Sequence, residues 1–217
     1  MDSLAQLLDL FLHLDAHLAA WAGVLGPWLY LVLFLIVFCE TGLVVTPFLP
    51  GDSLLFAAGA LASVEGSPLA VPPLLALLVV AAVAGDAVNF AIGSRVGPAI
   101  FTSERSRFLN RSHLIRTQEF YAKHGGKTIL LARFVPIVRT FAPFVAGIGR
   151  MRYGYFATYN VSGALAWVVS FVLAGYWFGQ LPSVKSNFHI VILAIVVISI
   201  LPILFEWIRA RRARGPA

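Results

Sequence analysis

Five ionisable residues interrupt the apolar stretches of this 217-residue chain, and their types suggest the chemistry of a buried anion site. They are the acids Glu40, Asp52 and Asp86 and the arginines Arg133 and Arg139. An unpaired buried charge is very costly, so we expect the acids and arginines to pair or to share water. The planar fork of arginine matches phosphate oxygens, whereas a desolvated carboxylate takes up a proton more readily. Together these residue types predict a site that exchanges a proton for an anion.

These five residues also have a purely structural interpretation, as ion pairs that hold helices together. That interpretation is strongest for Asp86, which lies within a long apolar stretch together with Asn89 rather than at a break in a helix. We therefore treat Asp86 and Asn89 as accessory candidates. The predicted phosphate ligands are Arg133 and Arg139, and the predicted proton carriers are Glu40 and Asp52.

Composition indicates the environment that surrounds these charges. The chain is 59% hydrophobic and only 12% charged, and its mean hydropathy is +0.86, whereas a typical soluble domain is about 25% charged. These values predict an all-α integral membrane protein, a helical bundle formed by a single domain over residues 27–208. The lone Cys39 allows no disulfide within the chain. The first 25 residues lack Lys and Arg, so we expect no cleavable secretory signal.

Two apolar segments are interrupted by proline and glycine in a way that predicts re-entrant hairpins. In the first, over about 29–62, the uncharged arms 29–39 and 53–62 would each cover about 15–17 Å of a bilayer core of about 30 Å. The second, over about 120–149, repeats this design around its two arginines. Irregular backbone at such a depth is tolerated against protein or a wet cavity. The residues predicted to break these helices are Pro47, Pro50, Gly51, Pro136 and Pro143.

The remaining segments predict about three full transmembrane helices, over about 74–93, 156–178 and 188–208. Residues 1–26 are predicted to form an amphipathic helix in the membrane interface, and residues 209–217 form a basic tail. Most Lys and Arg residues then fall on the side of the tail, which predicts a cytoplasmic C-terminus. The same orientation places the two hairpins on opposite sides of the membrane. Two opposed broken hairpins that meet near the midplane are typical of a transport site.

Other chemistries are disfavoured by residue spacing. Asp9, His13 and His17 share a helix face, but a hydrated polar face is the simpler interpretation than a metal site. The segment HGGKT at 124–128 lacks the first glycine of a phosphate-binding loop, since Tyr121 stands there. His113 and His124 lack the arrangement of arginine or lysine, serine and histidine that a lipid phosphatase needs. We therefore expect no enzyme, no cofactor and no metal. The basic segment 95–127 fits anionic lipid head groups better than nucleic acid.

The order of the motifs resembles that of the bacterial DedA family of membrane proteins. The residues that carry this resemblance are ETG at 40–42, PFLPGDSLLFAAGALA at 47–62, the GD at 85–86 and RFVPIVRTFAPFVAGIGRM at 133–151. The resemblance covers roughly residues 28–180. It implies two facing re-entrant hairpins, with the family's essential acids at Glu40 and Asp52 and its essential arginines at Arg133 and Arg139.

The same resemblance implies movement of a phosphate-bearing lipid, such as undecaprenyl phosphate, across the bacterial cytoplasmic (inner) membrane with the help of the proton motive force. The expected partners are that lipid and protons, and a homo-oligomer is possible. A proton-coupled antiporter for ions or small cationic solutes is the first alternative, although arginines at the site would oppose a cation. A phospholipid scramblase and a purely structural membrane protein are the further alternatives.

Overall fold

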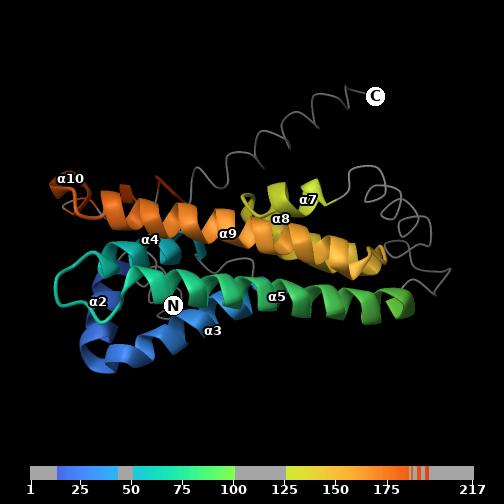
Figure 1. The fold of residues 1–217 in the computed structure, drawn as a ribbon, viewed down its shortest axis with the longest axis horizontal. Helices are drawn as coiled ribbons and strands as arrows, with labels where there is room; N and C mark the ends of the chain where they lie inside the picture. Colours follow the sequence, from blue (N-terminus) through green and yellow to red (C-terminus); the bar gives the residue numbers. More distant parts are fainter. Residues whose placement is uncertain are drawn as a thin grey trace, which may run out of the picture. The chain divides into compact units, whose positions relative to one another are not determined.

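The computed structural model describes residues 14–43, 51–100, 126–185, 187, 190–191 and 194–195. Every regular element within these residues is a helix (Figure 1), which agrees with the predicted all-α class. Three helical stretches of the described chain are long and apolar enough to cross a membrane: Ala20–Gly42, Val71–Val96 and Tyr153–Phe178. The last two contain the predicted spans 74–93 and 156–178. Several predictions fall wholly or partly outside the described residues. They are the tail 209–217, Pro47, Pro50, most of the span 188–208, and residues 1–13 of the predicted interfacial helix.

The first of these stretches is longer than the sequence pattern predicted. Helix α2 (Leu14–Leu25), the 3₁₀ helix η1 (Gly26–Trp28) and helix α3 (Leu29–Gly42) follow one another directly. The predicted eleven-residue arm is therefore part of a 23-residue apolar stretch, which is long enough for a full crossing. The reason is that residues 20–28 carry no charge, and the 3₁₀ helix η1, which begins at Gly26 with φ 51°, joins α2 to α3 without a loop.

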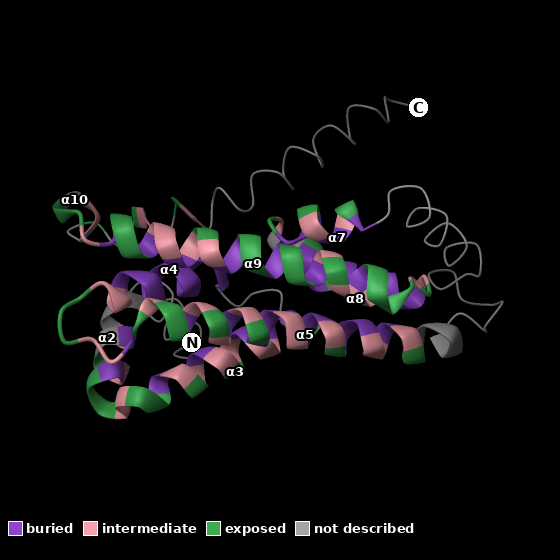
Figure 2. Cartoon of the chain, in the orientation of Figure 1, coloured by how far each residue is buried: buried purple, intermediate pink, exposed green. Residues whose placement is uncertain are grey.

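Contacts divide the chain into two compact units, each described here by itself. The first unit contains residues 1–29, 50–71 and 171–217. In it α2 packs against α4 (Gly51–Ala62), and the short α10 (Pro182–Lys185) follows the end of α9. Every residue of α4 from Gly51 to Ala60 is buried (Figure 2), as is expected for a short helix that is apolar on all sides beyond Asp52 and Ser53 in its first turn.

The second unit contains residues 30–49 and 72–170. Its elements are α3 from Tyr30 onward, α5 (Val71–Ile100), α7 (Lys127–Ala132), α8 (Pro136–Ile148) and most of α9 (Tyr153–Phe178). Helix α5 has 30 residues and would extend about 45 Å at about 1.5 Å per residue. It therefore offers a long surface against which the shorter helices of this unit can pack.

Each unit contains a close crossing of two helices through paired glycines. In the second unit, a Cβ on Gly93 of α5 would collide with the carbonyl oxygen of Phe144, and a Cβ on Gly147 of α8 would collide with that of Phe90. The carbonyl that each glycine meets belongs to the residue three positions before the partner glycine. Small residues permit this close backbone approach between helices in a membrane.

The same reciprocal pattern recurs in the first unit. There a Cβ on Gly59 of α4 would meet the carbonyl oxygen of Val172, and a Cβ on Gly175 of α9 would meet that of Phe56. The four segments have related sequences: FAAG at 56–59, FAIG at 90–93, FVAG at 144–147 and VLAG at 172–175. The helices that follow the two predicted breaks are α4 and α8. Each crosses its partner helix, α9 or α5, through the same pattern of paired glycines.

The break between α7 and α8 lies where the sequence predicted one, but Pro143 was assigned wrongly as a breaker. Pro136 is the first residue of α8, and Val135 before it is extended (φ −119°, ψ 103°), as a following proline requires. Pro143 lies inside α8 and does not end it. A proline interrupts one backbone hydrogen bond of a helix, and the packing of buried neighbours such as Ala142 and Ala146 keeps α8 continuous through this position.

Burial is inverted relative to a soluble protein. In the part of the chain that the structure describes, large apolar side chains such as Val138, Phe141 and Leu165 are exposed, whereas ten polar or charged side chains are buried. A soluble domain almost never buries Glu, Asp or Arg fully unless they are paired. Together with the three long apolar helices, this distribution identifies an integral membrane protein whose polar groups face inward. The buried polar residues are Glu40, Thr41, Asp52, Ser53, Asp86, Asn89, Arg133, Arg139, Thr140 and Asn160.

We predict that Gly93→Ala destabilises the protein by about 1–3 kcal/mol, because the new methyl group would press on a backbone carbonyl that has no flexible end to yield. Gly154→Ala is the matched control, since a Cβ at Gly154 of α9 would meet nothing within 4 Å. The measurement is thermal unfolding of the purified variants in detergent. An unchanged melting temperature for Gly93→Ala would show that the crossing is looser than the structure indicates.

Candidate functional site

Glu40 is placed at the site by the contact between the C-terminal end of α3 and the middle of α5. A Cβ on Gly42 would lie 3.3 Å from the Cα of Gly85, and a Cβ on Gly85 would collide with the hydroxyl of Thr41. This approach fixes the last turn of α3, where the Glu40 side chain is only 1% exposed. Its Oε1 accepts a hydrogen bond from Nη2 of Arg139, on the first turns of α8, at 2.5 Å.

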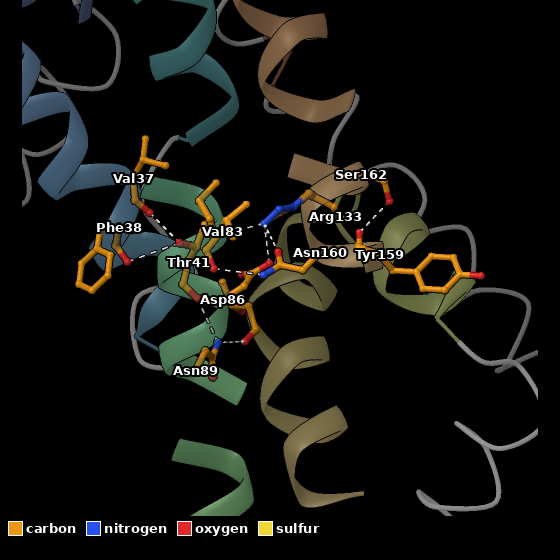
Figure 3. A network of polar contacts seen from close by, with 12 residues as sticks. Val37, Phe38, Thr41, Val83, Asp86, Asn89, Arg133, Tyr159, Asn160 and Ser162 are labelled. Carbon is orange, nitrogen blue, oxygen red and sulfur yellow. Dashed lines mark hydrogen bonds and ion pairs between the residues drawn. The ribbon is translucent and has the colours of Figure 1, made fainter. Parts of the chain in front are cut away.

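A second buried ion pair lies in the same unit. Nη2 of Arg133, in the break between α7 and α8, is 2.5 Å from Oδ2 of Asp86 on α5 (Figure 3). The same nitrogen donates to Oδ1 of Asn160 on α9 at 3.2 Å and to the Ala82 carbonyl at 3.4 Å. The Asn160 amide in turn donates to the Val83 carbonyl at 3.1 Å. Arg133 is therefore held by α5 and α9 at once.

Both guanidinium groups lie near the ring of Trp167 on α9. The central carbon of Arg139 is 4.5 Å from the ring centroid and that of Arg133 is 5.7 Å away, both within the range of a cation–π interaction. Trp167 is fully buried, so this attraction acts in a desolvated setting. Gly163, one turn earlier on α9, lies beside the Arg133 side chain, where an added Cβ would make an ordinary van der Waals contact with its Cδ at 3.4 Å.

Asn89 connects the two halves of the first ion pair through the backbone. Its side-chain nitrogen donates to the carbonyl of Thr41 at 3.1 Å and to the carbonyl of Thr140 at 2.7 Å. These two residues directly follow Glu40 and Arg139. Thr41 lies in the last turn of α3, where helix carbonyls lack intrahelical partners. Asn89 thus fixes the end of α3 against the start of α8.

The network leaves polar atoms that can take up another ligand. Oδ1 of Asp86, Nη1 of Arg133 and Oδ1 of Asn89 are buried and have no hydrogen-bond partner among the described residues. Leaving a buried polar group unsatisfied costs about 1–3 kcal/mol. The Arg133–Asp86 pair is therefore joined through one nitrogen and one oxygen, with a free donor on one partner and a free acceptor on the other. Such a pair can receive a proton on its acid and an anionic oxygen on its arginine.

The structure brings five of the predicted residues into one unit: Glu40, Asp86, Asn89, Arg133 and Arg139. The sixth, Asp52, belongs to the first unit, where it is buried in the first turn of α4. A carboxylate at this position is favoured by the positive end of the helix dipole. Gly51, a predicted breaker, is the first residue of α4, and the segment 44–50 before it lies outside the described residues.

Sequence reasoning did not identify two residues of the network, Asn160 and Trp167. Both lie in a stretch that was interpreted only as an uncharged span. Asn160, Gly163 and Trp167 are spaced by three and four positions, so they share one helix face. That spacing of a polar, a small and an aromatic residue was the available signal, but an aromatic residue on an apolar helix does not by itself predict contact with a cation.

Comparison with known proteins identifies relatives over the whole chain. The VTT domain family matches residues 49–177. Protein DedA of Escherichia coli K12 is 57% identical over 217 residues, covering 100% of this chain and 99% of that protein. A membrane protein of Mycobacterium tuberculosis H37Rv is 44% identical over 195 residues, which is 90% of this chain and 86% of that protein. No solved structure matches.

A more distant relative carries a cellular location in its name. Inner membrane protein YqjA of E. coli K12 is 34% identical over 182 residues, which is 84% of this chain and 81% of that protein. The family match extends from before α4 to the end of α9, so it includes Asp52, Asp86, Arg133 and Arg139. Glu40 lies outside the matched range of the family but inside the full-length match to Protein DedA.

We predict that Asp86→Asn and Arg133→Gln each destabilise the protein by about 3–5 kcal/mol, because each leaves an uncompensated buried charge. The double variant should be less destabilised than the sum of the two single variants, since it removes both charges together. Urea or thermal unfolding in detergent measures this double-mutant cycle. Purely additive effects would mean that the 2.5 Å contact contributes nothing to stability.

Proposed function

Because the chain belongs to the DedA family of VTT-domain membrane proteins, we propose that it is a membrane lipid transporter. It moves undecaprenyl phosphate or a related phosphate-bearing lipid across the bacterial cytoplasmic membrane, coupled to protons. Arg133 and Arg139 bind the phosphate head group, and Glu40 and Asp52 carry the protons. The segments around 29–62 and 120–149 act as re-entrant hairpins that enter from opposite sides, with the C-terminus in the cytoplasm. In this arrangement α3 (Leu29–Gly42) by itself, rather than the whole stretch Ala20–Gly42, is the first arm.

The observation that supports this proposal most directly is the Arg139–Glu40 pair, buried with side-chain exposures of 3% and 1%. An arginine in this environment is already desolvated, so it binds a phosphate oxygen without a further loss of hydration. The carboxylate of Glu40 and the phosphate compete for the same guanidinium. Protonation of Glu40 removes its charge and leaves the guanidinium to the phosphate, and loss of that proton reverses the exchange.

The exposed apolar side chains support a lipid substrate. Val138 and Phe141 on α8 and Leu165 on α9 face outward, while Arg139 and Thr140 on α8 face inward. The hydrocarbon tail of a lipid can stay against such an apolar surface, so that only the head group needs the polar interior. An antiporter for cations is less well supported, because the guanidinium groups of Arg133 and Arg139 would repel a cation.

We predict that Arg139→Gln slows transport of undecaprenyl phosphate in proteoliposomes by about ten- to a hundredfold. A charge-assisted hydrogen bond contributes about 1.5–3 kcal/mol, which corresponds to that range. The assay follows the loss of outer-leaflet lipid with an inward or outward pH gradient. Arg139→Lys should lie between wild type and Arg139→Gln, because it keeps the charge but lacks the planar fork.

Arg152→Gln is the matched control, since Arg152 is exposed and follows α8. It should transport at the wild-type rate. Wild-type transport by a folded Arg139→Gln protein would refute the role of Arg139 as a head-group ligand. Flux of a small cation without any lipid movement would instead favour the antiporter.

A further inference from the structure

Each arginine of the network is paired with a different acid on a different helix. Arg139 of α8 bonds to Glu40 of α3, and Arg133 of the α7–α8 break bonds to Asp86 of α5, both at 2.5 Å. The proposed function provides for proton transfer at Glu40 and Asp52 only. A dianionic head group on both arginines lies beside the Asp86 carboxylate, so the exchange at Glu40 alone leaves the buried site with one net negative charge.

We infer that Asp86 accepts a proton in addition to the two carriers of the proposed function, so that one phosphate head group binds to the two arginines together with two protons, one on Glu40 and one on Asp86. The proton on Asp52, which belongs to the first unit, is carried in a separate step. This inference rests on the proposed function and extends it to the number of protons. It changes the interpretation of Asp86 from a structural partner of Arg133 to a carrier that releases Arg133.

The charges balance in this exchange. Two protons convert the two carboxylates to neutral carboxylic acids, and both guanidinium groups stay positive. A phosphate monoester with two negative charges then replaces the two carboxylate charges. The net charge of the buried site is unchanged, which matters because the cost of burying net charge in an apolar medium is large.

The surroundings of Asp86 suit this role. Its Oδ1 has no hydrogen-bond partner among the described residues, so it can receive a proton without breaking an existing bond there. The charged groups that face it are Arg133, paired directly, and Arg139, which acts on it through space. Glu40 acts in the same way on Arg133. From α9 the neutral Asn160 and Trp167 contact the arginines.

Arg133 keeps its position when Asp86 is protonated. Its Nη2 also donates to Asn160 and to the Ala82 carbonyl, and these two acceptors do not titrate. Its Nη1 has no hydrogen-bond partner among the described residues and can donate to a phosphate oxygen. The exchange of Asp86 for phosphate therefore needs no movement of the guanidinium away from α9.

The experiment counts protons taken up when a short-chain polyprenyl phosphate binds to the full-length protein in weakly buffered detergent at pH 8. At that pH a phosphate monoester is a dianion, because its second pKa is about 6. A pH-sensitive dye and a parallel binding isotherm should give about two protons per bound lipid for wild type and about one for Asp86→Asn. The uncharged polyprenol should give none.

Glu65→Gln is the matched control, because Glu65 is an exposed acid between α4 and α5. It should keep the wild-type count of two. If Asp86→Asn does not fold, the double variant Asp86→Asn/Arg133→Gln replaces it, since it keeps the buried charges balanced. That variant should take up one proton per lipid bound at Arg139.

The outcomes separate the inference from the proposed function. Lipid binding with one proton or none in wild type overturns the inference but supports a phosphate-lipid site. Two protons in wild type and in both variants of Asp86 also overturn it, because another group then accepts the second proton. Absence of any binding by the phosphate lipid overturns the inference and the proposed function together.

Discussion

The pairing of arginine with carboxylate in a desolvated interior is the constraint on which the second unit depends. Four charged side chains, on α3, α5, α8 and the break before α8, are buried to within 3% exposure. Each would be very costly alone, so the helices that carry them must meet in one arrangement. Asn89 donates to a backbone carbonyl at the end of α3, Asn160 accepts a hydrogen bond from Arg133, and Trp167 contacts the guanidinium group of Arg139. The polar interior thereby specifies how these helices pack.

Close backbone contact makes this arrangement possible, and glycines provide it. A short ion pair from α3 to α8 requires α3 to approach α5 at Gly42 and Gly85, and α8 to approach α5 at Gly93 and Gly147. The driving force between helices in lipid is packing rather than the hydrophobic effect. The glycines are therefore as important to the site as the charged residues, although they contribute no chemistry.

The expectation that buried acids and arginines pair is confirmed for Glu40, Asp86, Arg133 and Arg139. It was possible because an ionisable side chain is rare within an apolar stretch. The predicted spans 74–93 and 156–178 were confirmed as parts of the longer helices Val71–Ile100 and Tyr153–Phe178, because their apolar composition is strong. The sequence did not predict Asn160 or Trp167, whose roles depend on which helix lies opposite. It was wrong about Pro143, because packing against neighbouring helices can maintain a helix through a proline, and local sequence does not report that packing.

Among the described helices, the glycine crossings and the acid–arginine pairs differ in their response to protons. The reciprocal glycine crossings of α4 with α9 and of α5 with α8 consist of backbone and apolar atoms, so a change in protonation leaves them intact. The acid–arginine pairs are weakened by protonation of the acid. A proton-coupled transporter needs both properties, since part of it must stay rigid while its site exchanges ligands. The separation of these contacts within α5, between Asp86 and Gly93, is consistent with the transport role that we propose.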